Sequence, residues 1–173
     1  MSSKRNLVYI VEGDTEEKLI KTLRSDLQCI RPGRVLKFNV IQNIIRTSVL
    51  LAFNPDSDFI LLFDTDCNNT ATLEKNVHII ENFSKKTKVY TIPQVMNLED
   101  ELVYSCSLKD IRIITGSRSE KDFKRDFLHM SNLWQKLIEN NFNIQRLWSR
   151  NASGEFKRVK NDSEYIKLIK RIN

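Results

Sequence analysis

The sequence of 173 residues has little of what makes a chain flexible or cross-linked. It contains four glycines and three prolines, which excludes a long flexible linker or a low-complexity tract. Its three cysteines, Cys29, Cys67 and Cys106, are isolated and odd in number, so we expect neither a disulfide framework nor a zinc knuckle. Cysteines used in this way are typical of a reducing compartment, and we expect the protein in the cytoplasm.

The sequence also lacks long apolar runs. None approaches the roughly 18–20 residues needed to span a bilayer, so no membrane association is expected. The N-terminal residues, Met1 to Arg5, lead directly into a short strand-like segment and do not form a signal peptide. With 40% hydrophobic and 29% charged residues, the composition is that of a globular protein with a core.

What the sequence does have is an uneven distribution of charge. Residues 1–108 carry 13 Lys and Arg against 14 Asp and Glu, whereas residues 109–173 carry 15 against 8. A basic part beside a part rich in carboxylates suits a polyanionic partner, DNA or RNA. The alternative is that the lysines serve only to keep the surface soluble.

Short apolar runs alternate with helical patterns along the first part of the chain. Residues 6–11 and 59–63 are nearly continuous apolar runs, as expected of strands buried on both faces. This pattern predicts an α/β fold with a central, mostly parallel sheet flanked by helices. We expect further strands at residues 35–41 and 88–92, and helices at residues 16–27, 43–53, 71–83 and 98–106.

The last part of the chain has a different pattern, in which strands are not expected. Helices are predicted at residues 121–129, 133–140 and 163–172, within the region that carries the basic excess. We therefore predict an α/β domain over residues 1–108 and a basic, mainly helical extension over residues 109–173 that packs on it.

Acidic residues follow two of the predicted strands. Glu12 comes directly after the first strand, and Asp64 and Asp66 follow the third. Ligands of open α/β sheets bind outside the carboxyl ends of the strands. Along an extended chain Asp64 and Asp66 lie on the same side, about 7 Å apart at Cα, so the three carboxylates form an oxygen-rich site suited to Mg²⁺. The alternative is an aspartate that caps the following helix.

The segments around these acids resemble a known domain. Val8-Tyr9-Ile10-Val11-Glu12-Gly13-Asp14-Thr15-Glu16, followed by Ile60-Leu61-Leu62-Phe63-Asp64-Thr65-Asp66, is similar to the signature of the Toprim domain. Topoisomerases, bacterial-type primases, recombination proteins and the OLD (overcoming lysogenization defect) nucleases share that domain. The Glu-Gly-x-Thr-Glu version is most similar to OLD-like phage-defence proteins. The resemblance covers roughly residues 6–106 and implies a Toprim-like, Rossmannoid catalytic domain.

The resemblance implies specific roles for the acids. Glu12 becomes the general acid/base or metal-bridging carboxylate, and Asp64 and Asp66 become metal ligands. Glu16 becomes a candidate ligand of a second ion, because OLD-like enzymes use two. The implied cofactor is therefore Mg²⁺ or Mn²⁺, with two ions bound.

Three further positions belong to the same resemblance. Many such proteins carry another glutamate in the helix after the fourth strand, where either Glu99 or Glu101 is a candidate metal ligand. The alternative for both is a helix N-terminus, where acids suit the macrodipole. Asn68 stands where topoisomerase-type domains usually carry an acid, so this position offers an oxygen without a charge.

A basic segment follows the acidic motifs. Lys121 and Lys124 are three residues apart on a predicted helix and so share a face. OLD-like enzymes use a basic residue downstream of the acids, which makes these two lysines catalytic candidates that neutralise developing charge. The alternative is a solvated helix face. The candidate nucleic-acid contacts in this segment are Arg118, Lys121, Lys124 and Arg125.

These patterns favour a metal-dependent nuclease that cuts DNA or RNA, in bacterial defence or in a mobile element. One alternative is a non-catalytic effector or nucleic-acid-binding subunit that works with a separate ATPase or another protein partner. A primase-like nucleotidyl transferase is a second alternative. A receiver domain with Asp64 as phosphoacceptor is a third, although the paired acids expected at the end of its first strand are missing.

Overall fold

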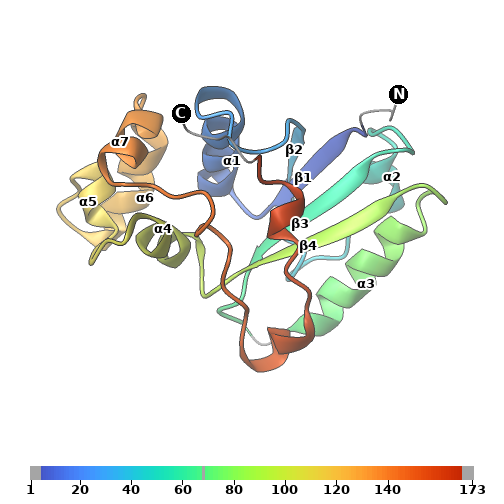
Figure 1. Cartoon of the computed structure of the whole chain (residues 1–173). Helices are drawn as coiled ribbons and strands as arrows, with labels where there is room; N and C mark the ends of the chain where they lie inside the picture. The colour runs from blue at the N-terminus through green and yellow to red at the C-terminus, as the bar shows by residue number, and fades with distance from the viewer. Residues whose placement is uncertain (1–4, 68, 169–173) are drawn as a thin grey trace.

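A computed structural model describes residues 5–67 and 69–168 of the chain. Four strands form one parallel sheet in the order β2-β1-β3-β4, and their carboxyl ends meet at one edge, beside α4 (Figure 1). The predicted α/β class with a central parallel sheet is confirmed. The strands are β1 (Leu7–Val11), β2 (Arg34–Lys37), β3 (Asp58–Asp64) and β4 (Lys88–Gln94).

Both faces of the sheet are covered, which explains why its inner strands are apolar throughout. In β1, Leu7, Tyr9 and Val11 contribute to one core cluster, and Val8 and Ile10 contribute to another on the opposite face. Alternating side chains of a strand point to opposite faces, so a strand buried on both sides needs an unbroken apolar run. The predicted strands at residues 6–11 and 59–63 are confirmed for this reason.

Different helices cover the two faces. Most of them pack on the face that contains Tyr9, where α4 to α7 lie together with α1 (Figure 1). They are α1 (Asp14–Lys21), continued by a π-helical turn (Thr22–Asp26), α4 (Leu98–Cys106), α5 (Arg112–Thr115), α6 (Glu120–His129) and α7 (Leu133–Glu139). The other face is covered by α2 (Thr47–Leu50) and α3 (Thr70–Glu81).

After α7 the chain returns to the sheet. The Tyr165 ring stacks on the Tyr90 ring of β4, with centroids 3.8 Å apart, and the Thr91 backbone N–H donates to Asp162 Oδ2 over 3.1 Å. Two short 3-10 helices interrupt this returning segment: η2 (Gly154–Arg158) and η3 (Ser163–Tyr165). In the described residues no helix is both long enough and apolar enough to span a bilayer.

The helix predicted at residues 43–53 is wrong except for α2. Asn76, a buried residue of α3, binds two backbone groups at the start of this segment, one of which, the Asn43 carbonyl, such a helix would use. Its Oδ1 accepts from the Ile45 N–H over 2.8 Å, and its Nδ2 donates to the Asn43 carbonyl over 2.8 Å. Buried backbone groups need a partner, and here a distant side chain supplies it, so the segment stays irregular.

The strand predicted at residues 35–41 is shorter than expected. The Asn39 side chain accepts from the backbone N–H groups of Ile41 (3.0 Å) and Gln42 (2.8 Å), which makes a turn. An asparagine that binds the backbone two or three residues on ends a strand in this way. Because β2 is an edge strand, no second neighbour holds it extended.

The helix predicted at residues 163–172 is not found where the chain is described. Only Ser163–Tyr165 is helical, as a 3-10 turn, and Lys167 then forms an antiparallel bridge with Ile30. Residues 169–172 lie outside the described residues. The other helices predicted above correspond to α1 with its π-helical turn, α3, α4, α6 and α7, each within about two residues at its ends.

Candidate functional site

The carboxyl edge of the sheet brings two of the predicted acids together. Asp64 is the last residue of β3, and Glu12 follows β1, the neighbouring strand. The backbone N–H of Asp64 donates to Glu12 Oε1 over 3.3 Å. From β1 the chain leads to β2 on one side, whereas β3 lies on the other, so these acids sit at the point where the strand order reverses. Such switch points are where open α/β sheets bind ligands.

A third acid lies next to this pair. Glu16 is on the first turn of α1 and is only 6% exposed, and its Oε2 accepts from the Thr15 hydroxyl over 3.1 Å. A Cβ added to Gly13 would lie 3.2 Å from the same oxygen, so a larger residue there would crowd the carboxylate. Glycine at position 13 therefore leaves room for Glu16 beside the strand ends.

The electrostatics of these acids differ from those of carboxylates on an open surface. The pKa of Asp64 is raised from 3.8 to about 8, first by burial and then by the charges of Glu12 and Glu16. Burial is also the main cause that raises the pKa of Glu12, and Glu16 and Asp66 add to it. Such clustered carboxylates repel one another, and a bound cation would relieve the repulsion.

A pocket opens at this edge, and we call it the acidic pocket. Six of the side chains that line it are carboxylates and two are lysines. Its walls come from the end of β3, the start of α4, the loop before α5, and α6. It is lined by Asp64, Asp66, Asn97, Glu99, Asp100, Val103, Lys109, Asp110, Ile111, Glu120, Phe123 and Lys124.

Glu99 and Glu101, which the sequence did not separate, have different surroundings. Glu99 lines the acidic pocket, with Lys124 Nζ 3.5 Å from its Oε1. Residues two apart on a helix point about 200° from one another, so Glu101 faces the interior instead. Glu99 therefore remains a candidate metal ligand, and Glu101 does not.

The carboxylate of Glu101 is fully used in the interior. It is 0% exposed, and its Oε1 accepts from the Val95 N–H (2.9 Å) and from Arg150 Nη2 (3.1 Å). Its Oε2 accepts from the Trp148 N–H over 3.0 Å. These bonds hold the segment after α7 against the end of β4, which is a structural role.

Of the four basic residues predicted to contact nucleic acid, one reaches the acidic pocket. Lys124 lines it, whereas Lys121 and Arg118 are exposed and do not. Arg125 Nη2 pairs with Asp122 Oδ1 (3.1 Å) and with Asp126 (2.9 Å), so acids of its own helix compensate its charge. Sharing a helix face was therefore not sufficient to bring Lys121 to the site.

Contacts with α1 hold the helix that carries Lys124. Lys18 Nζ donates to the Leu128 carbonyl over 2.7 Å and also to the Met130 carbonyl. These carbonyls lie at the C-terminal end of α6, where a cation suits the helix dipole. Because α1 starts directly after Glu12 and Gly13, this bond fixes α6 relative to the acidic edge.

Two residues of the site were not predicted from the sequence. Gln94 ends β4 and is buried, and its Nε2 donates to Asp64 Oδ1 over 2.6 Å. Its Oε1 accepts from the indole Nε1 of Trp148 over 3.1 Å. Because an indole N–H can only donate, it sets the orientation of the amide, and the amide in turn holds one oxygen of Asp64. No sequence pattern links positions 94 and 148.

The donors at this edge fit a magnesium ion that is shared with a substrate. Among the described residues no group of three or more His, Cys, Asp or Glu side chains is gathered closely enough to hold a metal by itself. Mg²⁺ commonly takes one or two carboxylates and keeps waters or substrate phosphates as its other ligands. Glu12 and Asp64, with Asp66 nearby, match that preference. Asn68 lies outside the described residues.

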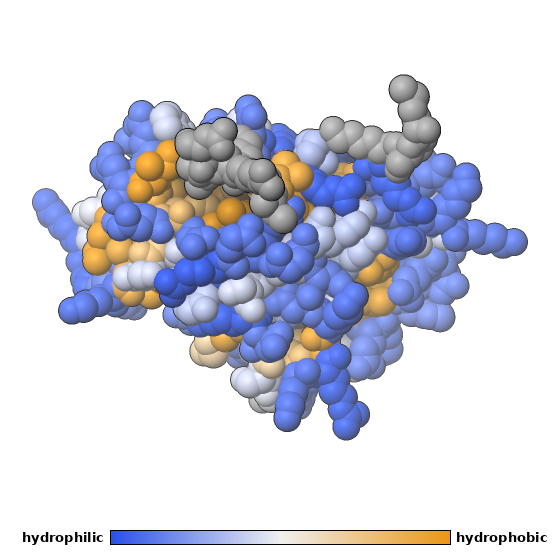
Figure 2. All heavy atoms as spheres, in the orientation of Figure 1, coloured by the Kyte–Doolittle hydropathy of each residue, from blue (hydrophilic) through white to orange (hydrophobic). Residues whose placement is uncertain are grey.

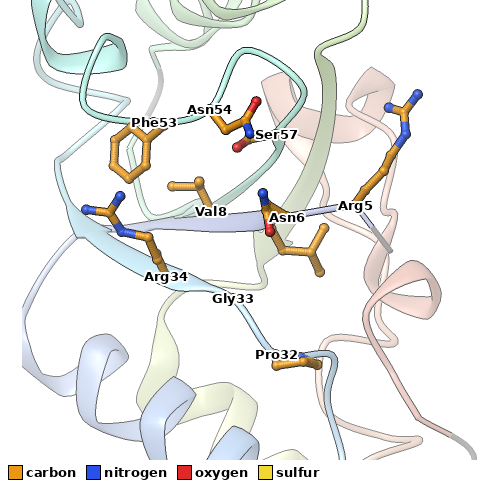
Figure 3. Close-up of a pocket in the computed structure, with 10 residues that line it drawn as sticks. Arg5, Asn6, Val8, Pro32, Gly33, Arg34, Phe53, Asn54 and Ser57 are labelled. Carbon is orange, nitrogen blue, oxygen red and sulfur yellow. The ribbon is translucent and has the colours of Figure 1, made fainter. Parts of the chain in front are cut away.

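A second pocket, at the opposite edge of the sheet, has a different character (Figure 3). Its two arginines already have partners: Arg5 Nη1 donates to Asp58, and Arg34 Nη1 donates to the Ala52 carbonyl. The Arg34 guanidinium also lies 4.7 Å from the centre of the Phe53 ring. None of the described residues that line this pocket is a carboxylate, and we assign the pocket no chemistry.

Comparison with known proteins returned no match for this chain among protein-family models, curated proteins or solved structures. The fold class follows from the parallel sheet itself. We therefore infer the function from the residues at the carboxyl edge and from their chemistry.

Proposed function

We propose that this protein is a metal-dependent nuclease that hydrolyses phosphodiester bonds of DNA or RNA. One observation carries the proposal: Glu12 and Asp64, 52 residues apart, are joined by a hydrogen bond at the switch point of the sheet. The raised pKa values of both carboxyl groups support it, because perturbed carboxylates beside a pocket are typical of active sites.

In this proposal Asp64 and Asp66 hold Mg²⁺ or Mn²⁺, which when bound polarises a phosphate and lowers the pKa of a water ligand. The raised pKa of Glu12 suits a general base that takes a proton from the attacking water. Lys124, a few ångströms from Glu99, supplies a positive charge toward the phosphate oxygens. Glu16 and Glu99 are the candidate ligands of a second ion.

The resemblance of the Glu-Gly-Asp-Thr-Glu and Asp-Thr-Asp segments to Toprim domains agrees with this proposal. It favours a Toprim-type nuclease related to OLD-like phage-defence proteins, with action in bacterial defence or in a mobile element. The strand that precedes Glu12-Gly13 and the later strand that ends at Asp64 are neighbours in the sheet, since β1 pairs with β3.

Incubation of the purified protein with plasmid, single-stranded DNA and tRNA tests the proposal, in Mg²⁺, in Mn²⁺ and in EDTA. We expect cutting that needs the metal and that falls at least about 100-fold in Glu12→Gln and Asp64→Asn, because each removes a group that acts in the transition state. Glu81→Gln, the same chemical change at an exposed position of α3, should leave cutting unchanged. Equal cutting by all four proteins would rule out this active site.

One observation favours a second candidate, a nucleic-acid-binding subunit that needs another protein. The described residues contain no complete group of three metal ligands, so a partner or substrate would have to complete the site. This candidate predicts that the purified protein binds nucleic acid and does not cut it under any metal condition. Co-purification with an ATPase that restores cutting would support it directly.

A further inference from the structure

Residues 150–160 form a closed loop, which we call the basic loop. Asn161 closes its base, since its Nδ2 donates to the carbonyls of Trp148 (2.8 Å) and Arg150 (2.9 Å). The Ser163 hydroxyl donates to the same Trp148 carbonyl over 2.8 Å. A loop whose two ends are held together in this way has a defined shape, although its only regular structure is the short 3-10 helix η2.

Two buried side chains anchor the basic loop to the sheet. Phe156 is 2% exposed, and its ring centre lies 5.8 Å from that of Phe63. Ala152 is buried in the same cluster. Phe63 directly precedes Asp64, so the loop is fixed near the same end of β3, on the sheet face opposite to the one toward which Asp64 points.

The charged residues that the basic loop exposes are mainly cationic. Lys157, Arg158 and Lys160 are exposed, against a single acid, Glu155. Within residues 5–67 and 69–168 neither Lys157 nor Arg158 forms an ion pair, whereas Lys160 pairs with Asp162 over 2.6 Å. Long hydrophilic side chains project at the lower end of the molecule in Figure 2, where Figure 1 shows η2.

A groove lies between the basic loop and α3. Lys157 and Arg158 line it from one side, and Thr70 and Glu74, on the first turns of α3, line it from the other. Because α3 begins four residues after Asp66, this groove lies next to the carboxyl edge. The acidic pocket by itself repels a polyanion, so a chain of phosphates needs cations beside it in order to approach.

We propose that the basic loop binds the sugar–phosphate backbone of a nucleic acid through Lys157 and Arg158. In the proposed nuclease, the role of the loop is to hold the nucleic-acid strand beside Asp64. This role, though not the binding itself, rests on the proposed nuclease function. A membrane surface fits the loop less well, because its residues include no exposed large hydrophobic side chain that could insert into lipid. Segments that bind phosphates through surface cations do not need such an anchor.

Fluorescence anisotropy with labelled single-stranded and duplex DNA and RNA tests the proposal, in EDTA and over a range of salt concentrations. Each phosphate contact contributes about 0.7–0.9 to the slope of log affinity against log salt, so Lys157→Ala/Arg158→Ala should lower the slope by about 1.4–1.8. We expect at least about a tenfold loss of affinity at low salt. Both side chains are exposed, so the variant should melt at the same temperature as the parent.

Two double variants with the same loss of charge serve as controls. Lys85→Ala/Lys88→Ala removes exposed charges near the amino end of β4 and should leave the affinity nearly unchanged. Arg118→Ala/Lys121→Ala tests the surface predicted from the sequence, at the start of α6 and just before it, and should also have a small effect. An affinity loss in the α6 variant with none in the loop variant overturns the proposal.

Other outcomes are equally decisive. The proposal is overturned if the parent protein binds no nucleic acid. It is also overturned if the loop variant, tested in parallel with phosphatidylserine vesicles, loses binding only to the vesicles and not to nucleic acid. Because the binding measurement in EDTA needs no catalysis, it separates the loop from the active site. If the parent protein cuts nothing but the loop variant binds nucleic acid more weakly, the loop proposal stands and the nuclease proposal is refuted. If the parent protein cuts in a metal-dependent way but the loop variant binds with unchanged affinity, the nuclease proposal stands and the loop proposal is refuted.

Discussion

The two ends of β3 carry aspartates in opposite situations. Asp58, at the start, is 0% exposed and fully paired: Arg5 Nη1 lies 2.7 Å from its Oδ1, and the Tyr165 hydroxyl donates to its Oδ2 over 2.8 Å. Among the described residues Asp64, at the end, has one side-chain donor, Gln94, and its pKa is raised first by burial and then by the charges of Glu12, Glu16 and Asp66.

This difference separates a carboxylate with a structural role from one for which we propose a functional role. At the amino edge the fold supplies a cation and a hydroxyl, so the charge of Asp58 holds the N-terminal strand and the C-terminal segment together. At the carboxyl edge the fold brings acids close to one another and, within the described part of the chain, gives them only neutral hydrogen-bond donors (to Asp64, the Gln94 amide), which is unfavourable unless a cation binds. Residues that destabilise a protein in this way commonly serve its function.

The largest expected effect contrasts Glu101 with Glu99, two glutamates of α4. Gln at position 101 would turn an amide N–H toward groups that can only donate, so Glu101→Gln should lower the free energy of unfolding by about 3 kcal/mol. Glu99→Gln, at the exposed pocket, should change it by less than about 0.5 kcal/mol. Urea denaturation measures both, and equal effects would mean that the buried carboxylate has no structural role.

A somewhat smaller loss is expected at Asp58. Asp58→Asn keeps one acceptor oxygen but removes the charge that faces Arg5 and replaces the oxygen that Tyr165 binds, so the unfolding free energy should fall by about 2 kcal/mol. Asp56→Asn, an exposed aspartate two residues earlier, is the matched control. If Asp58→Asn proves as stable as this control, the amino edge is not held by its carboxylate.

At Asp64 the effect should have the opposite sign and depend on pH. The pKa of about 8 in the folded state lies above the ordinary 3.8, so ionisation of Asp64 opposes folding. The penalty is absent below about pH 4, grows as pH rises, and is complete above about pH 8. Since solvent screens a partly exposed group, Asp64→Asn should stabilise the metal-free protein by about 2 kcal/mol at pH 8.5, or about 4–8 °C in Tm.

Thermal melts of Asp64→Asn and of the parent at pH 4.5 and pH 8.5, in EDTA, check this prediction. The difference in Tm between the two proteins should be small at the lower pH and large at the higher. A difference that stays constant with pH would show that the gain does not come from the ionisation of Asp64.

The smallest expected effect concerns Gln94. Gln94→Met keeps the length of the side chain but removes the bond to Asp64 and the acceptor for Trp148. Partners that orient a metal ligand typically contribute tenfold or more to metal affinity, so Mn²⁺ binding should weaken about tenfold, which calorimetry measures. Gln42→Met, an exposed position before α2, should bind Mn²⁺ like the parent.

The predictable part of the fold consists of segments whose own pattern decides their structure. The apolar runs of β1 and β3 and the stripe of α1 were visible because strands buried on both faces and amphipathic helices leave a local periodicity. Glu12 and Asp64 were predicted to meet because parallel strands end at one edge, and the structure pairs their two strands directly.

The features that the sequence did not predict correctly depend on partners far along the chain. Asn76 binds the backbone around Ile45, 31 residues away, and no pattern near Ile45 announces this. The same holds for Gln94 and Trp148, 54 residues apart, which orient Asp64. Glu99 and Glu101 have similar neighbours in sequence, and only the packing of α4 decides which of them faces the acidic pocket.

The amino-acid sequence by itself determined the order of strands and helices and the delivery of acids to the ends of two strands, because periodicity and strand ends are local properties. Only the tertiary structure decided which charges are compensated: Asp58 and Glu101 by arginines and N–H or O–H donors, Asp64 by a single amide. Compensation depends on distances between segments that are remote in sequence, and these distances exist only once the chain has folded.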